Sequence, residues 1–220
     1  MRALVLLTLL ASNVAIADST SAPWRDDFTA RLEALALLQS LNADLLSHDS
    51  ATLTLDRWCG SHQLATPATI VAERIRNVDK QPTAEQRELL KVSANEPIRY
   101  RRVHLKCGER VLSEADNWYV PARLKKEMNQ VLENSDIAFG RAVQALDFQR
   151  RTVAAELLWR PLPEGWEMDP VLRGQPPPAL QIPHEVLQHR AILTLPDGTP
   201  FSMVVETYTA EVLGFPEPRR

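Results

Sequence analysis

Two charged side chains lie within apolar, strand-like segments and suggest the chemistry of a binding site. Glu206 belongs to the apolar run 201–208, and Arg102 belongs to the strand-like segment 99–107. Charged side chains are rarely buried without a partner. The pair predicts a pocket for a small carboxylic acid, in which the arginine binds the carboxylate and the glutamate acts on a hydroxyl or ether oxygen. The alternative is a structural ion pair, or edge-strand charges that face water.

Arg101, one residue before Arg102, is a second candidate for the ligand-binding arginine. We expect Arg102 and Glu206 to lie on neighbouring strands, with their side chains converging on one cavity. Alternate residues of a strand share a face, so Arg101 shares the more apolar face of Val103 and Cys107. His104 shares the face of Arg102 and either lines the same pocket or is exposed.

Composition argues against several other classes of function. The formal net charge of −3 is too mild for a general nucleic-acid binder. Glycine occurs only 7 times, and the chain has no phosphate-binding glycine loop, no GxSxG motif and no HExxH motif. The histidines have no metal-ligand spacing with cysteine or acidic residues. We therefore expect no metal and no cofactor.

The N-terminus has the pattern of a secretory signal peptide. Arg2 is followed by the apolar run 4–11, and Ala15 and Ala17 form a small-x-small cleavage site. We expect cleavage after Ala17, a single domain over residues 18–220 and a periplasmic or secreted location. No later run is long enough to cross a bilayer, so we expect no integral membrane segment in the mature chain.

The two cysteines leave two possibilities open. Cys59 and Cys107 could form one bridge in an oxidising compartment, or each could be a buried thiol. The apolar strand position of Cys107 favours separate thiols.

Alternating helical and strand patterns predict an α+β fold with an antiparallel sheet of about six strands. Helices are expected over residues 24–47, 51–59 with Ser50 as N-cap, 81–90 with Thr83 as N-cap, 124–132, and from Asp136 through 146. Strands are expected over residues 66–76, 99–107, 111–120, 150–159, 185–195 and 201–211, with hairpin turns at 108–110 and 196–198. The proline-rich stretch 161–183 is expected to be a loop.

Four motifs, in order along the chain, resemble those of the chorismate pyruvate-lyase family. They are Asp49-Ser50-Ala51-Thr52, the hairpin from Tyr100-Arg101-Arg102 through Trp118-Tyr119-Val120-Pro121, Phe139-Gly140-Arg141, and Thr199-Pro200-Phe201 through Glu206. The resemblance implies a sheet whose ligand is enclosed by two helical flaps, and cofactor-free conversion of chorismate into 4-hydroxybenzoate and pyruvate. It implies that Arg102 and Glu206 are catalytic and bind substrate, and that the backbone of Ala51 and Phe139 closes over the ligand.

Two features depart from that family. The stretch from Pro200 to Glu206 is one residue longer than the family spacing, which requires a β-bulge or a register shift. A signal peptide would also separate the protein from chorismate, which is a cytosolic acid. Three functions therefore stay open. The protein is a carbon–oxygen lyase of the chorismate-lyase type, an exported non-catalytic binding protein for a small aromatic or cyclic carboxylate, or a partner-binding protein that keeps only the fold. The oligomeric state is left open too.

Overall fold

The computed structural model describes residues 24–169 and 177–218. Within them, six strands form one antiparallel sheet in the order β1-β2-β3-β6-β5-β4. The strands are β1 (Ile70–Ile75), β2 (Arg99–Cys107), β3 (Arg110–Tyr119), β4 (Gln149–Leu157), β5 (Glu185–Thr194) and β6 (Pro200–Thr209). The α+β class and the six-stranded antiparallel sheet predicted from the sequence are confirmed.

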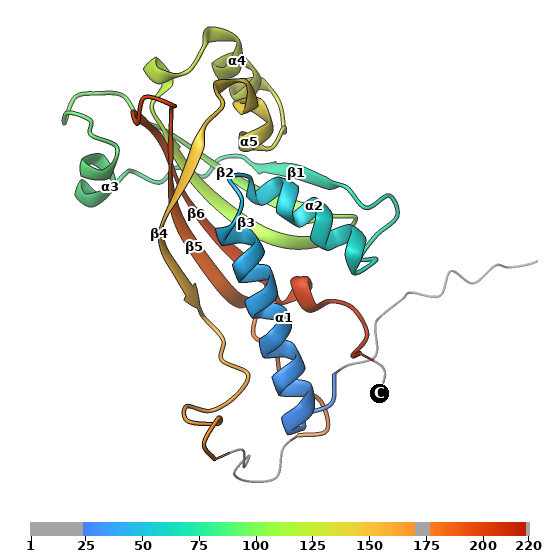
Figure 1. Cartoon of the computed structure of the whole chain (residues 1–220). Coiled ribbons are helices and arrows are strands. Elements are labelled where there is room, and N and C mark those ends of the chain that lie inside the picture. Colours follow the sequence, from blue (N-terminus) through green and yellow to red (C-terminus); the bar gives the residue numbers. More distant parts are fainter. Residues whose placement is uncertain (1–23, 170–176, 219–220) are drawn as a thin grey trace, which may run out of the picture.

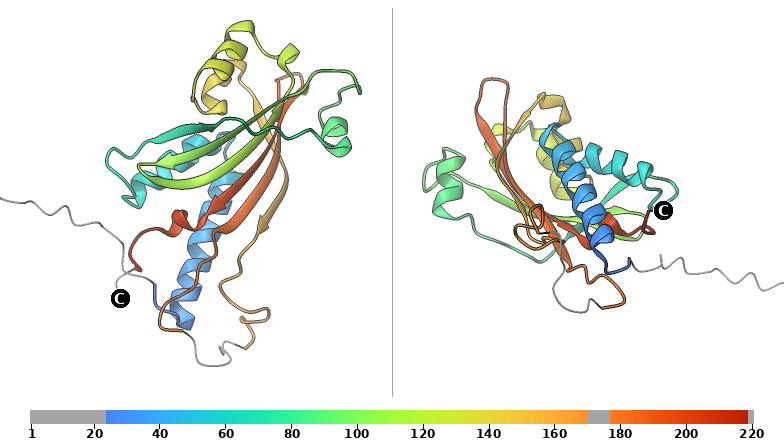
Figure 2. Two further views of the ribbon diagram at one scale, coloured as in Figure 1. Left: turned by 180° about the vertical axis from the view of Figure 1, so that it is seen from behind. Right: turned by 60° about the horizontal axis from the view of Figure 1, so that its bottom comes forward.

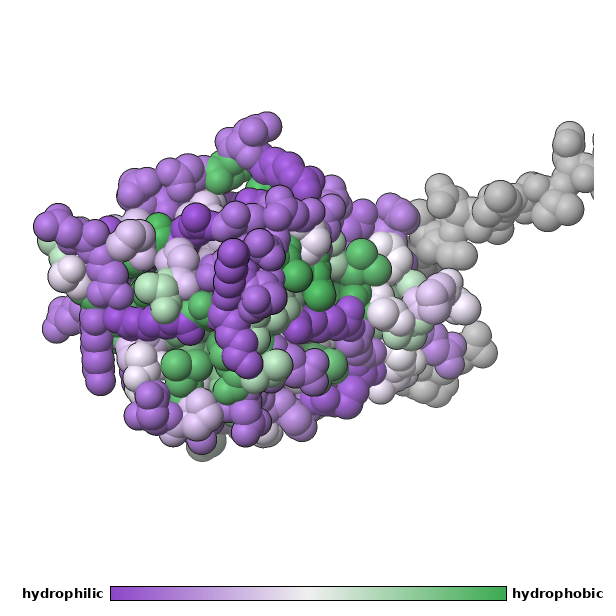
Figure 3. Space-filling view, turned by 90° about the horizontal axis from the view of Figure 1, so that it is seen from above, coloured by the Kyte–Doolittle hydropathy of each residue, from purple (hydrophilic) through white to green (hydrophobic). Residues whose placement is uncertain are grey.

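Helices α1 (Phe28–Leu46) and α2 (Ala51–Ser61) pack on one face of the sheet, while α3 (Ala84–Leu89) lies on the other side (Figures 1 and 2). Helices α4 (Lys126–Asn134) and α5 (Phe139–Ala142) lie together near one end of the sheet. Seen from that end, the surface is mostly hydrophilic, with small apolar patches (Figure 3). None of the described helices is long and apolar enough to cross a membrane.

The main core lies between α1, α2 and the covered face of the sheet. Leu38, Leu41 and Leu45 of α1 are at most 1% exposed, and they pack in the same cluster as Val103 of β2 and Val204 of β6. Strand residues of this covered face recur at every second position, as the pleat requires. This alternation determines which charged strand residues can reach the interior.

Local signals predicted several boundaries well. The predicted N-caps Ser50 of α2 and Thr83 of α3 are confirmed, and Thr83 forms a capping box with Gln86. Helix α1 begins at Phe28 and not at the expected residue 24, because Asp27 caps it through the backbone N–H of Ala30. The predicted register shift in the last hairpin is confirmed, because Leu193 pairs with Ser202 while Thr194 pairs with Pro200, leaving Phe201 as the extra residue.

Two expectations had other outcomes, and a third falls outside the described residues. Asp136 does not cap a helix, because its carboxylate pairs with Arg76 at 2.8 Å and α5 begins after Ala138. Cys59 and Cys107 are not separate thiols but form a disulfide; both positions are fully buried, so apolar surroundings alone did not distinguish a bridge from free thiols. The predicted signal peptide, residues 1–17, lies outside the described residues.

Candidate functional site

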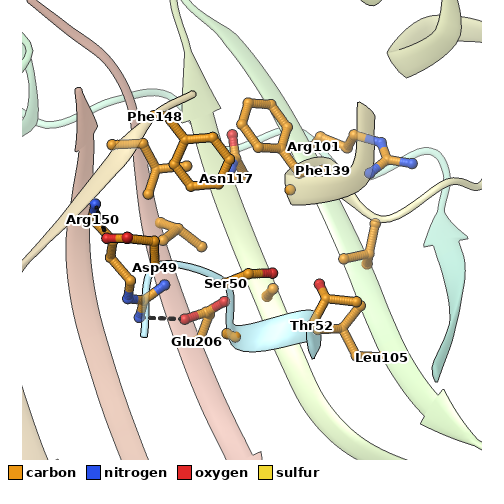
Figure 4. Close-up of a pocket in the computed structure, with 16 residues that line it drawn as sticks. Asp49, Ser50, Thr52, Arg101, Leu105, Asn117, Phe139, Phe148, Arg150 and Glu206 are labelled. Atoms are coloured by element: carbon orange, nitrogen blue, oxygen red, sulfur yellow. Dashed lines mark hydrogen bonds and ion pairs between the residues drawn. The ribbon is translucent and has the colours of Figure 1, made fainter. Parts of the chain in front are cut away.

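A pocket lies between the covered face of the sheet and the first turns of α2 and α5 (Figure 4). Its sheet wall includes Leu105 of β2 and Asn117 of β3, and its helix wall includes Thr52 and Phe139. Protein atoms leave about 520 Å³ unfilled there, including the open mouth. The space open to the centre of a water-sized molecule is only about 50 Å³, well below the usual size of small-molecule sites, so the wall must open further to admit a ring-sized ligand.

Glu206 lies on the pocket wall and is the residue of β6 that carries a buried charge. Its Oε2 accepts a hydrogen bond from Arg150 Nη2 at 2.6 Å and another from the Tyr208 hydroxyl at 3.3 Å. The other oxygen, Oε1, has no hydrogen-bond partner among the described residues and points toward the pocket in Figure 4. Glu206 therefore offers an acceptor to a ligand.

Arg150 reaches Glu206 from the edge strand β4. Its backbone N–H donates to Asp49 Oδ1 at 2.8 Å, which joins the strand to the turn before α2. Burial lowers the pKa of the Arg150 guanidinium, but the charge and hydrogen bond of Glu206 oppose burial, and the pKa is raised above its usual value. Burial, followed by the Glu206 charge, also raises the pKa of Tyr208, so its hydroxyl remains a donor.

Arg101 is the second guanidinium of the pocket wall, and it has no ion-pair partner among the described residues. Its Nη2 donates to the backbone oxygens of Ser135 and Ile137, at 3.2 and 2.7 Å. Its Nε and Nη1 are buried without any hydrogen-bond partner. Burial first, and the nearby Arg74 charge second, lower the pKa of Arg101 to about 10, which still leaves it protonated at neutral pH.

Arg102 does not lie in the pocket, so the predicted convergence of Arg102 and Glu206 is wrong. The side chain of Arg102 faces the opposite side of the sheet, where it pairs with Glu114 at 2.7 Å and with Asp116 at 3.6 Å. Its strand, β2, is separated from β6 by β3. Arg101 and Arg102 differ because of the pleat of the strand: neighbouring residues of a strand point to opposite faces of the sheet. Arg101, the competing candidate, is the one in the pocket wall.

Of the other residues considered from the sequence, Ala51 and Phe139 line the pocket and His104 does not. Ala51 and Phe139 line the pocket at the first turns of α2 and α5, while closure of their backbone over a ligand stays a prediction. His104 shares the uncovered face with Arg102 and is not part of the pocket wall. Sequence reasoning missed Arg150, although the rule applied to Arg102, a charged side chain within a strand-like segment, would also have selected it.

A buried histidine lies beside Glu206 on the covered face of the sheet. His189 pairs in register with Glu206 and is fully buried, and its Nε2 lies 2.8 Å from Asn42 Oδ1. Burial lowers the pKa of His189 to about 4, so the imidazole is neutral near pH 7. Among the residues described, no group of three or more histidine, cysteine or acidic side chains is arranged to hold a metal ion.

Comparisons with known proteins give partial matches to solved structures and one clear relative in sequence. No protein-family model matches the chain. Among solved structures, PhnF from Mycobacterium smegmatis matches 74% of this chain with 11% identity and a TM-score of 0.47. A separate structure of the PhnF effector domain matches 70% of this chain with 11% identity and a TM-score of 0.43, and 90% of that domain is covered. The possible transcriptional regulator YydK from Bacillus subtilis matches 65% of this chain with 19% identity and a TM-score of 0.40. The chain spans 65% of PhnF and 58% of YydK, less than two thirds of either.

The protein y4mC of Sinorhizobium fredii, whose function is uncharacterized, is 53% identical to this chain over 222 residues. The match covers 98% of this chain and 94% of y4mC. At this identity and coverage, the chain belongs to the same protein family as y4mC.

Proposed function

We propose that the protein binds a small ring-containing monocarboxylic acid that carries a hydrogen-bond donor at its other end. The observation that carries the proposal is Arg101, a buried guanidinium in the pocket wall that has two nitrogens without a hydrogen-bond acceptor and no carboxylate partner among the described residues. A buried charge without a partner is costly. A ligand carboxylate would supply both the missing charge and the missing acceptors.

The middle of the pocket suits a ring. Phe139 and Phe148 lie on the helix side, and Val103 and Leu105 lie on the sheet side. Apolar walls with a few placed polar groups are typical of sites for small organic ligands. Aromatic side chains also give a ring favourable offset or edge contacts. The guanidinium of Arg101 lies beside Phe139, at the α5 end of this apolar region (Figure 4).

The opposite end of the pocket offers an acceptor. Glu206 Oε2 already accepts from Arg150 and Tyr208, and an arginine can only donate. The free Oε1 is therefore matched by a ligand hydroxyl or amino group and not by an ether oxygen, which can only accept.

The charge of the wall favours a monoanion. Arg150 is paired with Glu206, and Asp49, which also lines the pocket, is exposed, so Arg101 is the buried charge of the wall that has no counter-ion among the described residues. Chorismate carries two carboxylates and would leave one of them without a partner. Cleavage of chorismate is the second candidate function, favoured by the presence of Glu206 in the pocket, where the family resemblance expects its catalytic glutamate.

We also propose that the protein is exported, after cleavage at Ala17. The disulfide between Cys59 and Cys107 supports this proposal, because structural disulfides persist mainly in oxidising compartments. N-terminal sequencing of the protein recovered from the periplasm tests it. A chain found in the cytosol and still beginning at Met1 would contradict it.

Calorimetric titration with four acids tests the binding proposal. We expect 4-hydroxybenzoate to bind, 4-methoxybenzoate to bind roughly 10- to 100-fold more weakly because its ether leaves Glu206 Oε1 without a donor, and benzene-1,4-dicarboxylate to bind more weakly still. Chorismate should bind weakly and release no pyruvate. Pyruvate release would instead establish the lyase. Equal affinity for the hydroxy and methoxy acids, or no binding of any of them, would contradict the proposal.

A further inference from the structure

The two helices that wall the pocket are held at one point on the edge of the sheet. Asp56 of α2 accepts the backbone N–H of Ile70 through Oδ1 at 2.6 Å. Arg141 of α5 donates to the backbone oxygen of the same Ile70 at 3.0 Å. The two side chains also pair with each other, Arg141 Nη2 to Asp56 Oδ2, at 2.7 Å. Both backbone groups of one edge-strand residue are thus bound by a single ion pair.

The same turn of α2 is attached to the sheet a second time. Cys59, three residues after Asp56, forms the disulfide with Cys107, and Cys107 is the register partner of Ile70. We call this group of five residues, Asp56, Cys59, Ile70, Cys107 and Arg141, the Ile70 corner. At the corner, α2 is fixed both covalently and by hydrogen bonds. Helix α5 is fixed there only by Arg141.

The helix side of the pocket wall is formed by the turns of α2 and α5 that lie next to the Ile70 corner. Ala51 and Thr52 lie one turn before Asp56 on α2, and Phe139 and Gly140 directly precede Arg141 on α5. A helix of four residues such as α5 is far too short to be stable alone. Its position over the pocket must come from its contacts. Phe139 packs in an apolar cluster and Gly140 lies close to Ser50, while the ion pair to Asp56 is the charged contact that joins α5 to α2.

The partial exposure of the Arg141 and Asp56 side chains favours a role in positioning the pocket wall over a role in global stability. The side chains of Arg141 and Asp56 are 34% and 23% exposed, and ion pairs that reach solvent contribute little to the free energy of unfolding. We propose that Arg141 and Asp56 are positioning residues of the pocket: by joining α5 to α2 at the Ile70 corner, they make the two helix turns of the pocket wall open and close together. This coupling does not depend on the identity of the ligand.

Hydrogen exchange of the ligand-free protein, followed by mass spectrometry, tests the coupling. In Arg141→Gln, exchange should rise roughly tenfold in both residues 50–54 and residues 139–143, although the substitution lies only in the second segment. Asp56→Asn, which keeps an acceptor for Ile70 but removes the charge, should also raise exchange in both segments. Arg141→Lys, which keeps the charge, should restore slower exchange.

The matched control is Arg57→Gln. Arg57 is adjacent to Asp56 on α2, and its ion pair with Asp44 at 3.1 Å joins α2 to α1 instead. This control should leave exchange in residues 139–143 unchanged. A rise confined to the substituted helix, or an equal rise in the control, would overturn the proposal.

A binding measurement adds a second readout that rests on the proposed function. The dissociation rate of 4-hydroxybenzoate should rise roughly tenfold in Arg141→Gln, with the midpoint of thermal unfolding close to that of the control. If wild type fails to bind 4-hydroxybenzoate, the proposed function fails while the exchange measurement still decides the coupling. Binding by wild type with an unchanged dissociation rate in Arg141→Gln would count against the positioning role.

Discussion

The Arg150 guanidinium and the Glu206 carboxylate form an ion pair with 2.6 Å between Nη2 and Oε2, and their side chains are only 4% and 8% exposed. Such a pair gains little net stability over apolar residues, but loss of one partner leaves an uncompensated buried charge. The pair therefore makes Glu206 and Arg150 depend on each other both for stability and for the chemistry of the pocket.

Substitution of either member should be strongly destabilising. Arg150→Met and Glu206→Leu should each lower the free energy of unfolding by about 3–5 kcal/mol, because each leaves one buried charge alone. The double variant should be more stable than the sum of the two single changes predicts. Urea denaturation of the three variants and wild type measures this coupling, and strict additivity would show that the pair is not coupled.

Arg101→Met should abolish binding of 4-hydroxybenzoate, since the pocket would lose the cation that receives the ligand carboxylate. Truncation of one member of a buried charge pair costs about 2–5 kcal/mol of binding free energy. Arg102→Met is the matched control, because it is the next residue on the same strand but pairs with Glu114 on the other face. Calorimetry should show unchanged affinity in this control. Loss of binding in Arg102→Met with retention in Arg101→Met would return the role to Arg102.

Acid should weaken the fold through His189. The pKa of His189 is lowered by burial to about 4 in the folded state, against about 6.5 in the unfolded chain. The unfolded chain therefore binds the proton first, so the stability from this group is complete above pH 6.5 and is lost as the pH falls toward 4. At about 1.4 kcal/mol per pKa unit, the loss approaches roughly 3 kcal/mol.

Denaturation curves between pH 7 and pH 4.5 measure this loss, with His189→Leu expected to flatten the dependence. His184→Gln provides a control, because His184 is an exposed histidine that pairs with Glu114. An unchanged pH dependence in His189→Leu would show that other groups cause the acid sensitivity.

Removal of the disulfide should destabilise the protein. Cys59 and Cys107 are 48 residues apart, and closing a loop of that size is worth about 4 kcal/mol through the unfolded state. The double variant Cys59→Ala and Cys107→Ala should lose close to that amount in urea denaturation. Dithiothreitol should lower the thermal midpoint of wild type but not that of the double variant, and an equal response of the two would exclude the bridge as the cause.

The strands were predictable because their signals are local. Turns such as Gly198, with φ of +80°, and the period-two burial pattern depend on neighbours in sequence. The site was only partly predictable, because its partners come from different strands. The choice between Arg101 and Arg102 depends on which face of the sheet the helices cover. The pairing of Arg150 with Glu206 depends on strand order, and no local pattern encodes either of them.

The place of β6 has a consequence for how the chain is made. It is the last of the described strands along the chain, yet it lies in the middle of the sheet, between β3 and β5. A growing chain therefore cannot join the two halves of its sheet, and has no Glu206, until translation has passed Thr209. Until then the apolar edges of β3 and β5 are unpaired and available to chaperones or to other chains. The pocket therefore forms only after translation has passed Thr209, and the export proposed above would have the period before that in which to engage a chain that is still unfolded.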